Sequence, residues 1–211
     1  MKKIAILLLL CMNSIISCSN EEFDVFSSKF PQLSLPIASD KSSDFNDSFY
    51  YHIQLDKESS ITEQEFVKYI KTSRWGEFQQ PTDSLLHIYH YVPVGRLDYK
   101  SYVILFVNCG YMPLPNDYDG LDIGTYENLL CVYTRDGKRT DSIVFSGHGC
   151  ISNQDGKFAP NWHADMPLTF EEGSFTDDGT IVIQHFKDNE RTPYSIDTLQ
   201  IDERSGKIIK Q

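Results

Sequence analysis

Apolar and polar residues alternate with a period of two along most of the second half of the chain, as in half-buried β-strands. Asp136-Gly137, Asp178-Gly179 and Ser205-Gly206 separate pairs of these stretches, and Asp-Gly favours a tight hairpin turn. Three hairpins with no helical periodicity between them predict a mainly-β domain, an antiparallel meander that forms a sandwich or an open barrel. The expected strands span residues 85–92, 101–108, 128–134, 139–145, 174–176, 180–187, 195–202 and 207–209.

The first half of the chain carries one further strand pattern, over residues 49–55, and one helix pattern. Thr62 and Glu65 have the spacing of a capping box, in which each side chain accepts a hydrogen bond from the backbone N–H of the other residue. An apolar stripe at helical spacing follows in Phe66, Tyr69 and Ile70. We therefore predict one helix near residues 63–73 that lies on the sheet.

The first residues of the chain have the pattern of a secretory signal. Lys2 and Lys3 form a short positive region, and an apolar run over residues 4–12 follows. The run is too short to cross a hydrocarbon core, which needs about 20 apolar residues in a helix. Its length fits the apolar region of a signal peptide.

The segment Ile15-Ile16-Ser17-Cys18 ends this pattern with an aliphatic residue three before a cysteine and a small residue directly before it. It resembles the lipobox of bacterial lipoproteins. The resemblance implies that diacylglycerol is attached to the Cys18 thiol, that residues 1–17 are removed, and that the new amino terminus is acylated, with palmitate as the expected acyl group. Two or three acyl chains make such anchoring lasting.

The residues after Cys18 bear on where the anchored protein is sent. Ser19, in place of an aspartate, resembles lipoproteins that move on to the outer membrane. The acidic pair Glu21-Glu22 resembles the export tag of surface-displayed lipoproteins, although a solvated acidic tether has the same composition. We expect a protein of the cell envelope, held by lipid in the outer membrane and facing either the periplasm or the cell surface.

The chain divides into three parts on this reading. Residues 1–17 are the signal peptide, residues 18–48 are a lipidated tether and an extended segment that leads into the domain, and residues 49–211 are a single mainly-β domain. Serine, aspartate, asparagine and lysine dominate residues 39–48, and Pro31 and Pro36 indicate an extended edge segment, because proline cannot donate to a sheet ladder.

The net charge of −11 excludes some partners. Nucleic-acid binding depends on lysine and arginine that neutralise phosphates, so we expect no nucleic-acid partner. The negative charge also argues against direct binding of the domain to anionic lipid head groups. The sequence contains no phosphate-binding loop, nucleophile elbow, zinc-protease motif or dinucleotide fingerprint, and we expect no cofactor.

Three cysteines remain in the domain once Cys18 carries lipid. Cys131 stands inside an apolar strand-like run, which predicts a buried, reduced thiol. Cys109 and Cys150 each border glycine in loop-like sequence and are the favoured disulfide pair among the three possible pairings.

Cys150 also belongs to a group of residues that could carry chemistry. His148 is two residues before it, and His163 and Asp165 follow a short segment later. These residues could form a zinc site, or a thiolate–imidazole pair with an acid that orients the base, as in a hydrolase. The alternative is a glycine-rich loop with a structural or disulfide-bonded Cys150.

Alternating acidic residues suggest a calcium loop. Asp117, Asp119 and Asp122 surround Gly120, but the later glutamate of a calcium loop is not at the expected spacing. The alternative is a solvated acidic turn. A further pair, His87 and His90, falls within an expected strand, where residues three apart point to opposite faces and do not share a metal.

These patterns name no reaction. The leading expectation is a non-enzymatic lipoprotein that binds an envelope protein or a glycan through residues 110–127 and 146–170. The alternatives are a hydrolase that uses Cys150, His148 and His163, and a calcium-dependent binding domain.

Overall fold

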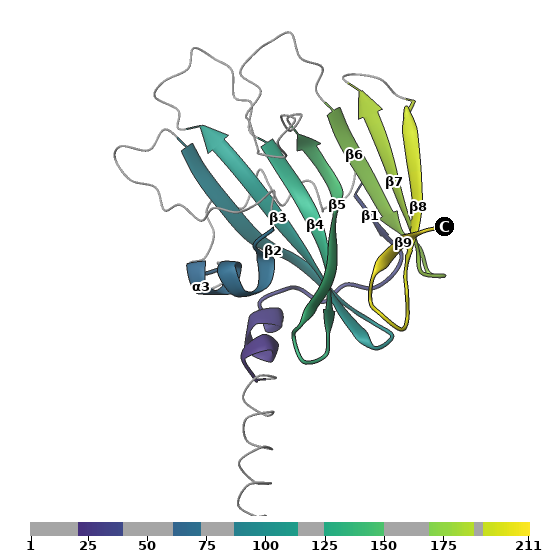
Figure 1. The fold of residues 1–211 in the computed structure, drawn as a ribbon. Coiled ribbons are helices and arrows are strands. Elements are labelled where there is room, and N and C mark those ends of the chain that lie inside the picture. Colours follow the sequence, from purple (N-terminus) through teal and green to yellow (C-terminus); the bar gives the residue numbers. More distant parts are fainter. Residues whose placement is uncertain (1–20, 40–60, 73–86, 114–124, 150–168, 188–191) are drawn as a thin grey trace, which may run out of the picture.

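The computed structural model describes residues 21–39, 61–72, 87–113, 125–149, 169–187 and 192–211. Within these residues, nine strands form one antiparallel sheet, and β2 to β9 lie side by side in chain order (Figure 1). The sheet is open, because β2 and β9 are its two ends, so the predicted meander is confirmed in its open form. The strands are β1 (Ile37–Ala38), β2 (His87–Tyr99), β3 (Tyr102–Pro113), β4 (Thr125–Thr134), β5 (Arg139–Gly149), β6 (Thr169–Phe175), β7 (Thr180–Lys187), β8 (Ser195–Ile201) and β9 (Ile208–Lys210).

The three predicted hairpins are present as β4–β5, β6–β7 and β8–β9. Their turn glycines, Gly137, Gly179 and Gly206, have φ values of 83°, 89° and 67°. Glycine adopts this left-handed conformation without the steric cost of a Cβ atom. The turn residues therefore set the hairpin positions that the sequence pattern predicts.

The sheet has two different ends. The connections β2–β3, β4–β5, β6–β7 and β8–β9 are short turns at one end, which we name the turn end. The strands β3, β5 and β7 finish at the other end, which we name the distal end; Figure 1 shows their arrowheads there. All the longer connections between strands therefore join the sheet at the distal end.

The strands β3 and β4 are buried on both faces. One hydrophobic cluster includes Leu105 and Cys131, and it lies against the helices. The neighbouring residues Ile104, Phe106 and Leu130 belong to a second cluster that also contains residues of β1, β6, β7 and β8. Burial on both faces accounts for the nearly continuous apolar sequence of these two strands.

The predicted helix near 63–73 is present but shorter. It consists of α3 (Glu63–Glu65) and a π-helical continuation, η1 (Phe66–Ile70), and both hydrogen bonds of the Thr62–Glu65 capping box are formed. Lys71, with φ −43° and ψ 125°, leaves the helix. The Arg139 guanidinium of β5 donates to the carbonyls of Tyr69 at 3.0 Å, Ile70 at 2.6 Å and Lys71 at 2.7 Å. These last carbonyls have no partner within the helix, so Arg139 satisfies the helix end.

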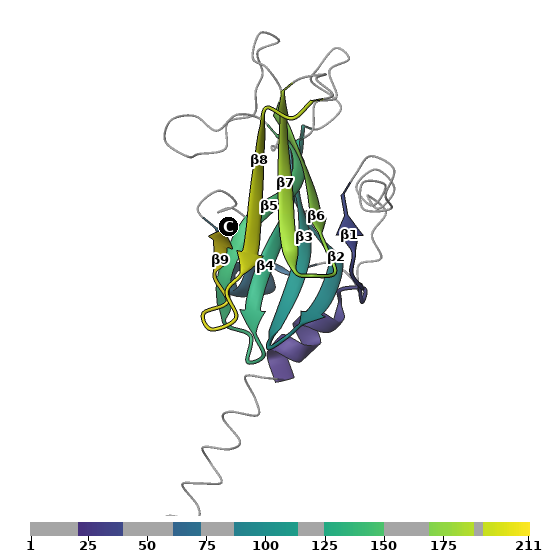
Figure 2. The ribbon, with the colours of Figure 1, turned by 90° about the vertical axis from the view of Figure 1, so that its right-hand side faces the viewer.

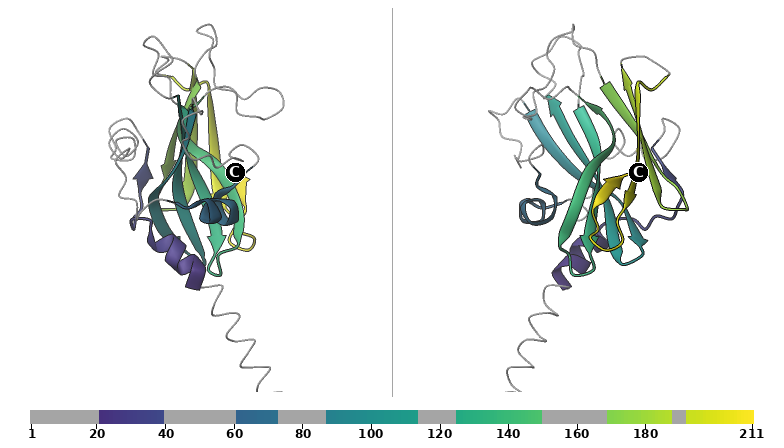
Figure 3. Two further views of the ribbon diagram at one scale, coloured as in Figure 1. Left: turned by 90° about the vertical axis from the view of Figure 1, so that its left-hand side faces the viewer. Right: turned by 45° about the vertical axis from the view of Figure 1, so that its right-hand side comes forward.

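A second helix covers residues 21–28, in the part of the chain expected to be a tether. Phe23 and Phe26 are each 1% exposed and belong to the cluster on the helix side of the sheet. The ring of Phe26 stacks on that of Tyr69, with centroids 4.4 Å apart. Figures 2 and 3 show this helix at the turn end of the sheet. Ordered packing therefore begins earlier than the composition suggested.

The segment after this helix is extended, as expected. Leu33 N–H donates to the carbonyl of Arg96, and Arg96 N–H donates to that of Pro31, each at 2.7 Å. The segment thus covers part of the β2 edge before β1 pairs with β6. Across the described ranges, no helix is long and apolar enough to cross a membrane.

Candidate binding site at the distal end of the sheet

A row of polar residues crosses the sheet near its distal end. The register pairs Asn108 with Asn128, and Asn128 with Ser146. The next residue, Gly147, pairs with Glu171, which in turn pairs with His185. We name Asn108, Asn128, Ser146, Glu171 and His185 the polar row.

The polar row marks the limit of the second hydrophobic cluster. Asn108 alternates with Phe106, and Glu171 and His185 alternate with Phe175 and Ile183, all members of that cluster. By the period of two along a strand, these polar residues lie on the strand faces that carry the core. The core therefore gives way to hydrogen-bonding groups at the distal end.

The β3–β5 part of the row is a buried ladder of hydrogen bonds. Asn108 Nδ2 donates to Asn128 Oδ1 at 2.8 Å, and Asn128 Nδ2 donates to Ser146 Oγ at 3.0 Å. The three residues are between 1% and 3% exposed. Within the described residues, Asn108 Oδ1 is buried and accepts no hydrogen bond. A buried acceptor without a donor costs about 1–3 kcal/mol, so this end of the ladder is less stable than its two internal hydrogen bonds suggest.

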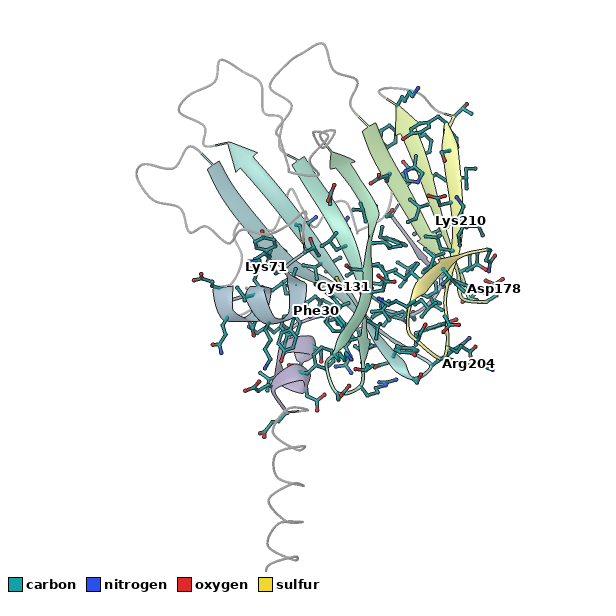
Figure 4. All side chains as sticks on the ribbon, viewed as in Figure 1. Phe30, Lys71, Cys131, Asp178, Arg204 and Lys210 are labelled. Atoms are coloured by element: carbon teal, nitrogen blue, oxygen red, sulfur yellow. The ribbon has the colours of Figure 1, made fainter. Side chains whose placement is uncertain are left out.

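Glu171 and His185 of the row, together with Asp197 of β8, form a group of ionisable side chains. His185 Nε2 lies 3.2 Å from Asp197 Oδ2, and His185 Nδ1 lies 3.5 Å from Glu171 Oε1. Lys210 of β9, which is labelled in Figure 4, donates from its Nζ to Asp197 Oδ1 at 2.6 Å. Hydrogen bonds from Lys210 and then from His185 lower the pKa of Asp197, so its carboxylate is ionised at neutral pH. Glu171, His185, Asp197 and Lys210, one residue from each of four neighbouring strands, thus form a chain of polar contacts.

This ionic group is open to solvent but is not built for a metal ion. The side chains of Glu171, His185 and Asp197 are 29%, 21% and 33% exposed, so a solute can reach them. The two carboxylates lie at different ring nitrogens, on opposite edges of the imidazole, and their oxygens do not converge. Across the described residues, no group of three histidine, cysteine or acidic side chains could hold a metal. The group can bind polar or charged ligand groups by hydrogen bonds.

The structure corrects the prediction for Cys109. It is a buried, reduced thiol within β3, because Gly110 continues the strand instead of opening a loop, and the expected bridge to Cys150 is not formed. Cys131 is buried and reduced, as predicted. Burial raises the pKa of Cys131 to about 11 and raises that of Cys109 as well, so both thiols are protonated at neutral pH and neither is a ready nucleophile.

The proposed Cys150, His148 and His163 site is only partly in view. His148 belongs to β5 and pairs with Tyr126 and Phe170, so the Gly147-His148-Gly149 segment is strand and not loop. Cys150, His163 and Asp165 lie outside the described residues. A hydrolytic site therefore stays a prediction from the sequence. Of its residues, the structure describes His148, which lies two residues beyond Ser146 on β5.

Of the other predicted sites, some lie outside the described residues and some lie within strands. Asp117, Asp119 and Asp122 of the calcium prediction, the strand over 49–55 and the lipid site Cys18 lie outside the described residues. His87 and His90 both lie in β2, where they pair with Pro113 and Gly110.

The fold and site define a class only: an open, mainly-β sheet domain with a polar distal end. Compared with family models, curated proteins and solved structures, the chain has no match.

Proposed function

We propose that the protein is a lipid-anchored lipoprotein of the cell envelope whose β domain is a non-enzymatic binding module. The lipid on Cys18 holds it in the outer membrane, and the distal end of the sheet binds an envelope protein or a glycan. The rigid sheet is the scaffold and the polar row contributes hydrogen-bonding groups to the contact surface.

The observation that carries this proposal is the separation of the two ends. Helix 21–28, which follows Cys18 closely in the chain, packs at the turn end. A Cβ atom built on Gly137 of the β4–β5 turn would lie 2.6 Å from Phe23, so helix and turn are in contact. The polar row lies at the other end of the same strands. An anchor at the turn end leaves the distal end turned away from the membrane and open to a partner.

The chemistry of the polar row supports a glycan or a polar protein segment as the partner. On β6 to β8 it offers two partly exposed carboxylates and an imidazole close to the distal end of the sheet. Tyr194 is 54% exposed, and its ring centroid lies 6.1 Å from that of His185. Hydroxyl groups of a sugar can donate to the carboxylates while the sugar ring contacts the exposed aromatic ring.

The binding test uses the Cys18→Ala protein, which is expected to be soluble, labelled with nitrogen-15 and titrated with solubilised envelope polysaccharide and with peptidoglycan fragments. We expect amide shifts of the β6–β8 strands near Glu171, His185 and Asp197 to move, and at least a severalfold loss of affinity in His185→Gln. Lys138→Gln, in the β4–β5 turn, is the matched control at the turn end. Shifts confined to the turn end would contradict the proposal.

The alternative, a hydrolase that uses Cys150, His148 and His163, can be tested in the same samples. Turnover of either glycan by the purified protein, lost in His148→Ala and in Cys150→Ala, would replace binding by catalysis. For a calcium-dependent binder, calcium would raise the melting temperature, EDTA would reverse the change and Asp119→Ala would remove it.

A further inference from the structure

The folded domain begins very close to the cysteine that is expected to carry the lipid. Ser19 and Asn20 alone separate Cys18 from Glu21, the first residue of the described helix. Three residue steps of extended chain span at most about 11 Å. The polar region of one leaflet is roughly 5–8 Å thick, from a total thickness of about 40–45 Å and a hydrocarbon core of about 30 Å. A lipid on Cys18 therefore holds Glu21 at the level of the head groups or just above it.

The helix cannot swing away from the sheet without unpacking its aromatic residues. Phe23 packs on Tyr133, with ring centroids 5.2 Å apart, and Phe26 stacks on Tyr69. The β4–β5 turn lies against Phe23 at Gly137. Since helix and sheet are one packed unit, the short connection to Cys18 constrains the whole domain and not the helix alone.

The surface at this end has the composition of a membrane contact. Val25, on the outward side of helix 21–28, is 60% exposed and offers an aliphatic side chain to whatever lies beside this helix. The adjacent β4–β5 turn exposes Lys138 and Asp136, and its Arg135, with a side chain 51% exposed, is paired with Asp98 at 2.6 Å. The acidic side chain of Glu22 is paired with Lys68. A groove of about 330 Å³ runs between this helix and the α3–η1 helix, lined by Glu21, Glu22, Val25, Gln64, Glu65, Lys68 and Tyr69.

We propose that the turn end is a membrane-contact surface, formed by helix 21–28 and the β4–β5 turn, that rests on the phospholipid head groups around the protein's own lipid. This inference rests on the proposed lipidation of Cys18. Val25 contacts the upper part of the acyl region, and Lys138 faces the phosphates. Glu21 and Asp24 oppose a strongly anionic surface, so the partner is a largely zwitterionic bilayer.

The test measures the depth of single tryptophans in the lipidated, full-length protein. Val25→Trp is compared with Ile196→Trp, since Ile196 is 53% exposed in β8 near the distal end. Each protein is reconstituted in phosphatidylethanolamine–phosphatidylcholine vesicles that contain phosphatidylcholine brominated near the glycerol end of its chains. Emission is taken as the difference from wild type, because Trp75 and Trp162 are native. We expect roughly twofold quenching for Val25→Trp, as for an apolar side chain at the head-group boundary, and none for Ile196→Trp.

Flotation of the same vesicles separates failure of this inference from failure of the anchor. Protein that floats while Val25→Trp and Ile196→Trp are quenched equally would overturn the membrane-contact surface and leave the lipid anchor intact. Protein that floats no better than Cys18→Ala would overturn the anchor itself. A flexible linker of about ten Gly and Ser residues between Asn20 and Glu21 should abolish the quenching at Val25→Trp. Quenching that survives the linker would contradict the short connection as its cause.

Discussion

The strand pairs β3–β4 and β7–β8 belong to one sheet but differ in how they are buried. Residues Val103 to Val107 of β3 are at most 2% exposed, with the helices on one face and the second hydrophobic cluster on the other. In β7, Ile181 and Ile183 are buried while the residues between and beside them are half-buried, and β8 exposes Ile196. The first pair is scaffold, and the second presents side chains to solvent. The chemistry accessible to a ligand therefore lies mainly on the β6–β9 side, and the predictions below separate the two regions.

The largest difference should follow from truncating the scaffold. Phe106 is fully buried, and its ring lies edge-on to Phe145 with centroids 5.1 Å apart. Phe106→Ala should lower the free energy of unfolding by about 3–5 kcal/mol, through lost burial and a cavity between rigid neighbours. Ile196→Ala, in the exposed strand, should change it by less than about 0.5 kcal/mol. Urea unfolding of both variants checks this, and similar losses would refute the division into two regions.

Helix 21–28 should prove to be part of the scaffold. Gly137 has a φ of 83°, and a Cβ atom there would lie 2.6 Å from Phe23. Gly137→Ala should cost about 2–4 kcal/mol, since a left-handed alanine is strained and the Phe23 ring must move. Lys138→Ala, in the same turn but exposed, is the control. A Gly137→Ala protein as stable as the control would mean that the helix does not press on the turn.

The amide ladder should show the asymmetry of buried hydrogen bonds. Asn128→Leu removes both bonds of Asn128 and leaves the amide of Asn108 buried without its acceptor, which should cost about 1–3 kcal/mol. The double variant Asn108→Leu/Asn128→Leu should cost less than the sum of the two single variants, because no amide is then left unpaired. A double-mutant cycle by urea unfolding measures the coupling. Strict additivity would show that the ladder is not formed.

The ionic part of the row should have the smallest effect on stability. Asp197→Asn should cost about 0.2–1 kcal/mol at pH 7, since the group is largely solvated and screened. The folded-state pKa of Asp197 lies below its ordinary value of 3.8, so its contribution is complete above that value and is lost as the pH falls through the folded pKa. Wild type and variant should therefore converge as the pH falls below the folded-state pKa of Asp197. A gap that persists in acid would exclude the carboxylate as its source.

Much of the sheet could be predicted from local signals. Asp136-Gly137 and Asp178-Gly179 set the hairpins, and the Thr62–Glu65 box sets the helix start. Helix 21–28 also carries a signal, because Phe23, Phe26, Ser27 and Phe30 stand at i, i+3, i+4 and i+7 and all are buried. The segment is otherwise polar and follows a lipobox, and these two features favoured the interpretation of residues 21–28 as a tether and not as a helix.

The polar row was harder to predict. The Glu171–His185 pair follows once the β6–β7 turn fixes the register, and that hairpin was predicted. The Asn108–Asn128 pair depends on the register of β3 on β4, whose connecting segment is too long for its Asp119-Gly120 pair to fix the pairing of the two strands. The alternation of apolar and polar residues predicts that the strand ends at Asn108, and it gives no reason to expect that the amide of this residue is buried. The polar row depends on how neighbouring strands are aligned, and the sequence pattern of a single strand does not predict that alignment.

With the proposed anchor on Cys18, the turn end faces the membrane and the distal end faces away from it. An azide-bearing amino acid placed at Tyr194 or at Lys138, both exposed, can be labelled on membrane-anchored protein with a bulky polymer-linked cyclooctyne, before and after detergent. The account predicts that Tyr194 is labelled equally fast in both conditions and that Lys138 is labelled slowly until detergent or Cys18→Ala releases the protein. Equal labelling of the two positions on anchored protein would contradict it.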